Sequence, residues 1–470
     1  MFEFRKFEGR TDQAVESIRR FAAHEALRSA TVDELELGDE FHRRALRPED
    51  LAFIKFSGPV TAATVTQLGF LAAQRLMSSI HEIGVAGLPP DGTEDSFARV
   101  ARFNDDEHAV LGAQVLPFLE SFAFDFLESE EEVRRARAHL VDYVREALRN
   151  EASFWRNVFE RLVHTKYLED GLRFAMLQVW SLAPSKRAAL GRAMASRFFE
   201  PLPASVLPRL SGDAPSDGAV HELAVRCGVR RLQHAYWQFY LSTSLARSNL
   251  LYSYARRPDR ALRLYGAAYA AEAEWLAFGC LVGAASARFG LGDLAEGAGG
   301  APVDDYVARF ERMTRTVERL WGDRGTTEVA RGLASAVSLG RVARQNLGEQ
   351  LRWLSSMETH REIARRIDGR VRAECPNIDR ETFVEPREMC STTHVHDDHR
   401  LVVIESGNMV FWGNLGMQLR LAPGEMVLVP QGRLHGSSIE SPECTYHQPI
   451  IPEQWVRALV AELDPTGNAL

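Results

Sequence analysis

The sequence predicts a multidomain protein in which two all-α regions, residues 1–130 and 131–360, precede a C-terminal all-β barrel, residues 371–470. Three observations support this prediction. A chain of 470 residues is long enough for about two to four domains, each with its own core. Apolar residues recur at helical spacing up to about residue 360. Beyond Val371, short β-prone runs separated by turns take their place.

The helical pattern is clear in the stretch 144–162. Apolar residues recur there on one face of the expected helix, with arginine and glutamate between them: Val144, Leu148, Phe154, Val158 and Leu162. Two segments interrupt the pattern. Glu200–Ala219 contains four prolines, which exclude a continuous helix. Gly290–Gly300 contains five glycines and is typical of a flexible connection.

The C-terminal region contains short runs of β-branched and large apolar residues. The expected strands are Leu401–Ile404, Met409–Trp412, Met417–Leu421 and Glu425–Val429. Segments rich in glycine, proline and serine separate them. Short strands at regular spacing with turns between them indicate a sandwich or a barrel.

Composition and charge exclude several classes of protein. The 56 lysines and arginines against 64 acidic residues give a net charge of −8, which argues against a nucleic-acid or anionic-membrane partner. The longest uncharged, mostly apolar stretch, Trp275–Ala287, is shorter than the ~20 residues of a spanning helix. The N-terminus has no secretory pattern, and the five cysteines form no CxxC pair. We therefore expect a cytoplasmic protein with reduced thiols.

Histidines are concentrated in the predicted barrel. Five of the 14 histidines lie there: His394, His396, His399, His435 and His447. His394 and His396 are two positions apart, so on a strand both rings project from the same face. The turn, strand and turn that precede His435 bring it onto a neighbouring strand. Three neutral imidazoles with open positions opposite suit a divalent metal such as Fe, Ni, Cu or Zn.

This stretch resembles the cupin family. His394-Val-His396 matches the first cupin motif, and the second motif is matched by Gly424, Pro430, Gly432 and His435. Where the family pattern places a glutamate after the first motif, this chain has Arg400 and Leu401. The resemblance therefore implies a three-histidine site without a carboxylate ligand. Such a site leaves the charge of the metal uncompensated, which favours an anionic or chelating substrate.

Other polar residues of the barrel are candidates for contacts with a substrate. Arg387 and Arg433 are candidates for binding a substrate carboxylate. Tyr446 is a candidate donor to a developing oxyanion, and strand alternation allows either Tyr446 or His447, but not both, to face the cavity. A structural role for His447 is an equal alternative, and we expect His399 in a solvated loop.

The whole chain resembles the nitrosourea synthase family of the streptozotocin pathway. Segments that carry the likeness include Ala73–Leu76, Phe122–Phe126, Val384–Arg387 and Arg433–Gly436. The resemblance implies a helical dimerisation domain, a haem-oxygenase-like di-iron oxidase domain and a C-terminal cupin. In that family the central domain N-hydroxylates a methylated arginine. The cupin iron, held by three histidines, then converts the product into an N-nitroso group with dioxygen.

The family's metal ligands carry over to this chain only in part. The cupin ligands match His394, His396 and His435, but only Glu272 matches a di-iron ligand. The other di-iron ligand positions hold Val206, Ser216, Phe310, Thr314 and Val317. A di-iron site needs about six carboxylate and imidazole donors on packed helices, so we expect the central site to be degenerate.

These inferences predict a mononuclear non-haem iron enzyme of the cupin type with one Fe(II) per chain and O2 as co-substrate. It would oxidise or rearrange a small nitrogen-rich metabolite of natural-product biosynthesis, with N-nitroso or N–N bond formation within its scope. The expected partners are a second copy of the chain, bound through residues 1–130, and a separate N-hydroxylating enzyme. Three alternatives stay open: a non-redox metal-dependent cupin, a non-catalytic metal- or ligand-binding partner of an oxidase, and a central domain that binds metal through other ligands.

Overall fold

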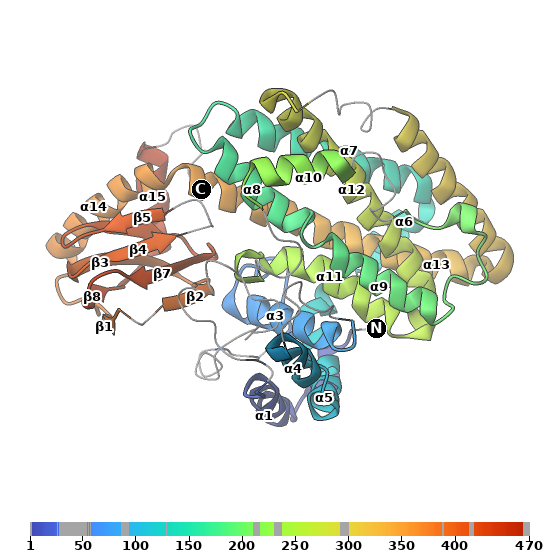
Figure 1. Ribbon diagram of the computed structural model, residues 1–470, viewed down its shortest axis with the longest axis horizontal. Helices are drawn as coiled ribbons and strands as arrows, with labels where there is room; N and C mark the ends of the chain where they lie inside the picture. Colours follow the sequence, from blue (N-terminus) through green and yellow to red (C-terminus); the bar gives the residue numbers. More distant parts are fainter. Residues whose placement is uncertain are drawn as a thin grey trace.

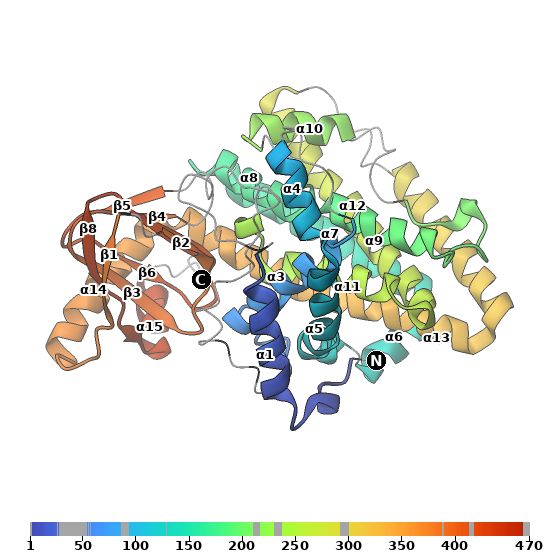
Figure 2. The same ribbon diagram turned by 60° about the horizontal axis from the view of Figure 1, so that its bottom comes forward.

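The computed structural model shows a helical body joined to a smaller β domain (Figures 1 and 2). It describes residues 2–25, 27, 54, 56, 58–85, 94–127, 129–209, 217–229, 237–291, 300–387, 390–412 and 418–463. Ser216 and part of the glycine-rich segment lie outside the described residues. The all-α and all-β parts follow each other along the chain as the sequence predicts.

The N-terminal part of the body is helical. Its elements are η1 (Phe4–Phe7), α1 (Thr11–Ala22), α3 (Leu68–Glu82), α4 (Glu94–Phe103), α5 (Asp106–Phe124) and η3 (Asp125–Leu127). The side chain of Asp105 starts α5 by accepting hydrogen bonds from the backbone N–H groups of Glu107 and His108. Because α5 packs between α1 and α3, most of its large apolar residues are buried, whereas Val110 is exposed.

The central part of the body is a larger helical bundle. Its elements are α6 (Glu130–Ala138), α7 (Leu140–Leu162), α8 (Leu168–Val179), α9 (Ala183–Ala195), η4 (Ala204–Val206), α10 (Asp217–Arg226), η5 (Trp237–Phe239), α11 (Ser242–Ala255), η6 (Pro258–Arg260), α12 (Ala261–Phe289) and α13 (Gly300–Ser355). α12 and α13 approach closely at two glycines. A Cβ on Gly266 would lie 2.1 Å from the carbonyl oxygen of Val329, and one on Gly332 would lie 1.9 Å from that of Arg263.

The interruptions of the helical pattern lie where the sequence predicts them. In the described part of the proline-rich segment, η4 is the helical element that precedes α10, which begins at Asp217. α12 ends at Gly290, which has a positive φ of 68°. α13 contains one further break, at Gly322, where φ is 58° and ψ is −153°. The two predicted helical regions share one continuous core, so the boundary at residue 130 stays a prediction.

One helical stretch, Val100–Leu127, has the length and composition of a membrane span, which the sequence analysis did not single out. In the protein, 67% of its most apolar window is buried. A buried core helix can have the same length and composition as a membrane span. α5, which makes up most of this stretch, packs against α1 and α3 in the protein.

The β domain consists of two antiparallel sheets. Its strands are β1 (Thr382–Pro386), β2 (Cys390–His394), β3 (His399–Ser406), β4 (Met409–Trp412), β5 (Gln418–Leu421), β6 (Met426–Val429), β7 (His435–Ile439), β8 (Glu443–His447) and β9 (Ile450–Ile451). One sheet has the order β1-β8-β3-β6, with β9 paired to β3, and the other has the order β2-β7-β4-β5. The four strands predicted from the sequence correspond to β3, β4, β5 and β6.

Two helices cover the outer face of the five-stranded sheet. α14 (Met357–Glu374) and α15 (Glu453–Leu463) pack with Leu401 of β3 and Leu428 of β6 into a separate apolar cluster. Alternate residues of the same strands, such as Val402 and Val429, face the other way, into the main core. Since residue 371 lies inside α14, we propose Met357 as the start of this unit. α15 is an element that the sequence patterns do not predict.

Candidate metal centre

Three histidines converge at one end of the β domain. His394 on β2 pairs directly with His435 on β7, and His396 lies two residues after His394, just beyond the end of β2. The ring centroids of His394 and His435 are 4.5 Å apart, and each is 4.9 Å from the centroid of His396. One nitrogen from each ring lies within 4.8 Å of the others. The structure thus brings together the three side chains selected from the sequence.

The protonation states of these rings suit a divalent metal. The Nδ1–H of His435 is directed to the carbonyl oxygen of Arg433 at 2.8 Å, which leaves Nε2 with its lone pair. Among the described residues, the Nε2 atoms of His396 and His435 are both buried without a hydrogen-bond partner. Burial, with the neighbouring imidazoles, lowers the pKa of both rings, so they are neutral. Buried neutral nitrogens without partners are what a metal ligand set requires.

Arg400 occupies the position where the cupin pattern has a glutamate. It lies on β3 opposite Val429, whose side chain faces the main core. The guanidinium bonds Asp398 at 2.5 Å and also pairs with Glu381. Burial opposes the charge, but these two carboxylates outweigh it and raise the pKa of Arg400. Two local carboxylates thus compensate this cation.

Tyr446 faces the space between the two sheets. It lies opposite Ile404 of β3 and Phe383 of β1, and its ring stacks on that of Phe383 at 5.3 Å. Burial and the neighbouring carboxylate of Glu385, which accepts its hydrogen bond, raise the pKa of the phenol. Glu385 is a residue that the sequence analysis missed. Glu385 is two positions after Phe383, so on a strand both side chains lie on the same face. This spacing is the sequence signal that could have identified it.

The other polar candidates either pair with groups of the protein or are exposed to solvent. Arg433 is buried, but its guanidinium pairs with Glu349 of α13. Arg387 is exposed in the turn after β1. The expectation that His399 lies in a solvated loop is wrong: it is the half-buried first residue of β3 and accepts a hydrogen bond from the backbone N–H of Gln431 at 3.1 Å. His447 contacts the side chains of Thr382 on β1 and Glu405 on β3. The geometry favours Tyr446 over its neighbour His447 as the residue that faces the interior.

Glu272 is bound to a guanidinium in the centre of the helical body. Arg309 of α13 donates to both carboxylate oxygens of Glu272, and the backbone N–H of Arg209 donates to Oε2 at 2.8 Å. Both side chains are buried. Burial opposes the charge of Arg309, but its bonds to Glu272 outweigh this effect and raise its pKa. A cation of the protein thus lies where the resemblance would place a metal.

The neighbouring positions of the expected di-iron site are filled by apolar side chains. Phe310 and Val317 are fully buried, and the ring of Phe310 packs edge-on against Tyr269 at 5.0 Å. Val206 is buried as well, and the hydroxyl of Thr314 donates to a backbone carbonyl of its own helix. None of these side chains is a metal donor suited to iron.

A second buried charge cluster connects five helices of the body. Its side chains are Glu151 of α7, Lys186 of α9, Arg247 of α11, Glu274 of α12 and Arg344 of α13. Glu274 bonds Lys186 at 2.6 Å and Arg247 at 2.5 Å, while Glu151 bonds Arg247 at 2.8 Å and also pairs with Arg344. Three cations thus share two carboxylates, and the bundle is held by ion pairs at its centre.

One other group of donor atoms converges in the described part of the chain. Nitrogen and oxygen atoms of His24, Asp105 and Glu107 lie within 4.8 Å of one another near the start of α5. The two carboxylates are exposed, and Asp105 already caps the helix. Unlike the histidines of the β domain, this group is largely exposed, and one of its carboxylates already accepts backbone hydrogen bonds.

Fold and site together define a class of protein: a helical body that carries a cupin-like β domain with a converging three-histidine cluster. No family model matches the chain. Over 431 residues the chain is 26% identical to the nitrosourea synthase of Streptomyces achromogenes subsp. streptozoticus, covering 87% of this chain and 89% of the relative. This similarity supports the assignment of the chain to the nitrosourea synthase family.

Proposed function

We propose that the chain is a metal-dependent oxidative enzyme of natural-product biosynthesis that acts through its cupin-like domain. His394, His396 and His435 would hold one Fe(II), and O2 would be the co-substrate. The substrate would be a small nitrogen-rich metabolite, such as an N-hydroxylated guanidine or amino acid, and the reaction an oxidation or rearrangement related to N-nitroso formation. The relative's name supports this chemistry. The observation that carries the proposal is the pair of buried Nε2 atoms without partners, at His396 and His435.

The residues around the cluster support this role in distinct ways. Bound Fe(II) supplies one-electron and O2 chemistry that amino-acid side chains lack. Arg433 fixes the tautomer of His435 through its backbone carbonyl. Phe411 stacks on His435 at 5.3 Å and excludes water from one face of the ring. Tyr446 would donate to an oxyanion on a bound substrate once its hydroxyl turns away from Glu385, which accepts its hydrogen bond in this structure.

The buried ion pair of Glu272 and Arg309 supports the proposal that this chain and a second enzyme catalyse different steps. A carboxylate neutralised by a guanidinium is a poor metal ligand, so we propose that N-hydroxylation occurs on a separate enzyme that supplies the substrate.

We also propose that the chain forms a homodimer through residues 1–130. Light scattering of the purified protein tests this proposal and should give twice the chain mass of 52.7 kDa.

Elemental analysis of the purified chain, compared with its His435→Ala variant, tests the proposed function. We expect one iron per chain in the wild type, and loss of both iron and O2 consumption in the variant. An equal metal content in both proteins would exclude these ligands. Activity without O2 and with zinc in place of iron would favour a non-redox cupin. Two or three ions per chain would indicate a further site in the helical body.

A further inference from the structure

The two segments that carry the histidines are both held by helices of the body. One segment, 393–397, contains His394 and His396, and the other, 432–435, ends at His435. The two segments also contact each other, since the backbone N–H of Gly432 donates to the carbonyl oxygen of His396 at 2.9 Å. Their other described polar contacts include several to α3, which lies next to the β domain in Figure 1, and to the C-terminal end of α13.

Helix α3 holds the first segment at both ends. The guanidinium of Arg75 donates to the carbonyl oxygen of Thr393 at 2.7 Å and to its hydroxyl at 2.9 Å. At the other end, the backbone N–H of Leu68 donates to the carboxylate of Asp397 at 2.8 Å. Leu68 and Arg75 are two helical turns apart, about 10 Å along the axis. Two hydrogen-bonding positions on one helix thus hold the two ends of this segment.

Helix α13 holds the second segment. The side-chain amide of Gln350 donates to the carbonyl oxygen of Leu434 at 2.9 Å, and its oxygen accepts from the N–H of Leu434 at 3.0 Å. The preceding residue, Glu349, pairs with Arg433. Arg433 in turn supplies the carbonyl that orients His435. A fully buried glutamine thus fixes the backbone directly before a proposed ligand.

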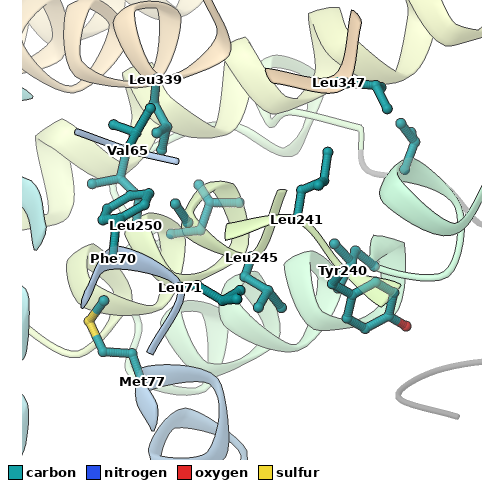
Figure 3. Close-up of a cluster of buried hydrophobic side chains, with 14 of the residues drawn as sticks. Val65, Phe70, Leu71, Met77, Tyr240, Leu241, Leu245, Leu250, Leu339 and Leu347 are labelled. Carbon is teal, nitrogen blue, oxygen red and sulfur yellow. The ribbon is translucent and has the colours of Figure 1, made fainter. Parts of the chain in front are cut away.

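The two helices are fixed relative to each other by apolar packing with α11. Figure 3 shows Leu71 of α3, Leu245 of α11 and Leu347 of α13 in the same buried cluster. Leu71 is one turn before Arg75, and Leu347 is one turn before Gln350. The guanidinium of Arg75 also lies over the ring of Trp237, 5.4 Å from its centroid. The helices therefore form a rigid support with a fixed separation between the two residues.

We propose that Arg75 and Gln350 are positioning residues of the metal centre, and that the helical body sets the geometry of the three histidines. Each residue acts on the backbone beside a ligand and contacts no metal. Because binding and positioning are linked, metal binding would in return stabilise the contact between body and β domain. This inference rests on the proposed function for the identity of the ligands.

Five full-length variants test the inference, the fifth being Gln350→Glu. Gln350→Met and Arg75→Met remove the contacts to the ligand segments with little change in volume. Asn346→Leu and Arg260→Met are matched controls. Asn346 is also a buried amide of α13, but bonds Thr243 of α11, and Arg260 is as buried as Arg75 but lies over the ring of Phe2.

The first measurement is the dissociation constant of Co(II), determined against a competing chelator, together with the visible absorption spectrum of the bound ion. Loss of an outer contact to a ligand weakens metal binding about 10- to 100-fold. We expect this loss and a changed spectrum for Gln350→Met and Arg75→Met, and unchanged values for both controls. Gln350→Glu, which keeps the acceptor but loses the donor, should fall between. Equal affinities and spectra in all the variants would overturn the inference.

The second measurement uses metal-free protein, so it does not depend on the proposed function. Amide hydrogen exchange of peptides that contain residues 393–397 and 432–435 should accelerate in Arg75→Met and Gln350→Met more than in the controls. If exchange stays unchanged, the helices do not position these segments. Failure of the wild type to bind metal, with exchange altered as expected, would refute the proposed function and leave the positioning role standing.

Discussion

Replacing Arg309 by methionine distinguishes a structural ion pair at Glu272 from a metal ligand. Arg309 is the donor to Oε1 of Glu272, whereas Oε2 keeps the backbone N–H of Arg209. The carbonyl oxygen of Leu207 loses its bond to the same guanidinium at 3.0 Å. Removing one partner of a buried ion pair costs about 3–5 kcal/mol. We expect about 4 kcal/mol, which increases the population of the locally open state about a thousandfold.

Native-state hydrogen exchange of α12 and α13 is the suitable assay, because a protein of several domains does not unfold in one step. The double variant Arg309→Met/Glu272→Leu should regain most of the loss, since an apolar pair can replace a buried ion pair at little cost. Metal content should be unchanged in Glu272→Gln. A cost below about 1 kcal/mol, as for an exposed pair, or loss of metal from Glu272→Gln would refute the reasoning.

Three further predictions concern packing, thiol reactivity and pH. Gly266→Ala and Gly332→Ala should each destabilise the α12–α13 contact by about 1–3 kcal/mol in native-state hydrogen exchange, because the added Cβ meets backbone, whereas the exposed helical Gly369→Ala should not destabilise. Burial raises the pKa of the Cys227 thiol to about 11, so alkylation at pH 8 should be slow until the protein unfolds; rapid labelling of the native protein would contradict this. Burial raises the pKa of Glu120 above 4.5, so its protonated form stabilises the fold at low pH, and this contribution is lost as pH rises through the raised pKa. Glu120→Gln should flatten that pH dependence of the melting temperature, and an unchanged profile would contradict the assignment.

Local sequence patterns predict most of the fold. Apolar spacing marks the helices, and the short β-branched runs mark strands such as β3 and β6, because burial on one face imposes a period on the sequence. The packing of α14 on the β domain could not be predicted in this way. Its amphipathic pattern shows that one face is buried, but not which part of the protein covers it. α15 was missed because only a short segment separates it from the last strand.

The sequence predicts those residues of the candidate site that are close together in the chain or belong to a known motif. His394, His396 and His435 follow from such a motif. Glu385 was missed because a single glutamate on a strand resembles a solvated residue. Arg75 and Gln350 lie 318 and 84 positions from the backbone groups that they bind. Contacts over such distances in sequence depend on the tertiary structure and leave no local pattern.

The packing of α14 bears on how this β domain could be exchanged among proteins. A fragment cut at residue 371 would lose most of α14 and keep only α15 over Leu401 and Leu428, so the newly exposed apolar surface would make the fragment prone to aggregate. A fragment that begins at Met357 keeps α14 packed over these residues, so Met357 is a suitable boundary for recombination of the β domain. Such a fragment would still leave Arg75 and Gln350 behind. A new host would have to offer equivalent supports, so inheritance of the barrel together with its helical neighbours is the simpler evolutionary course.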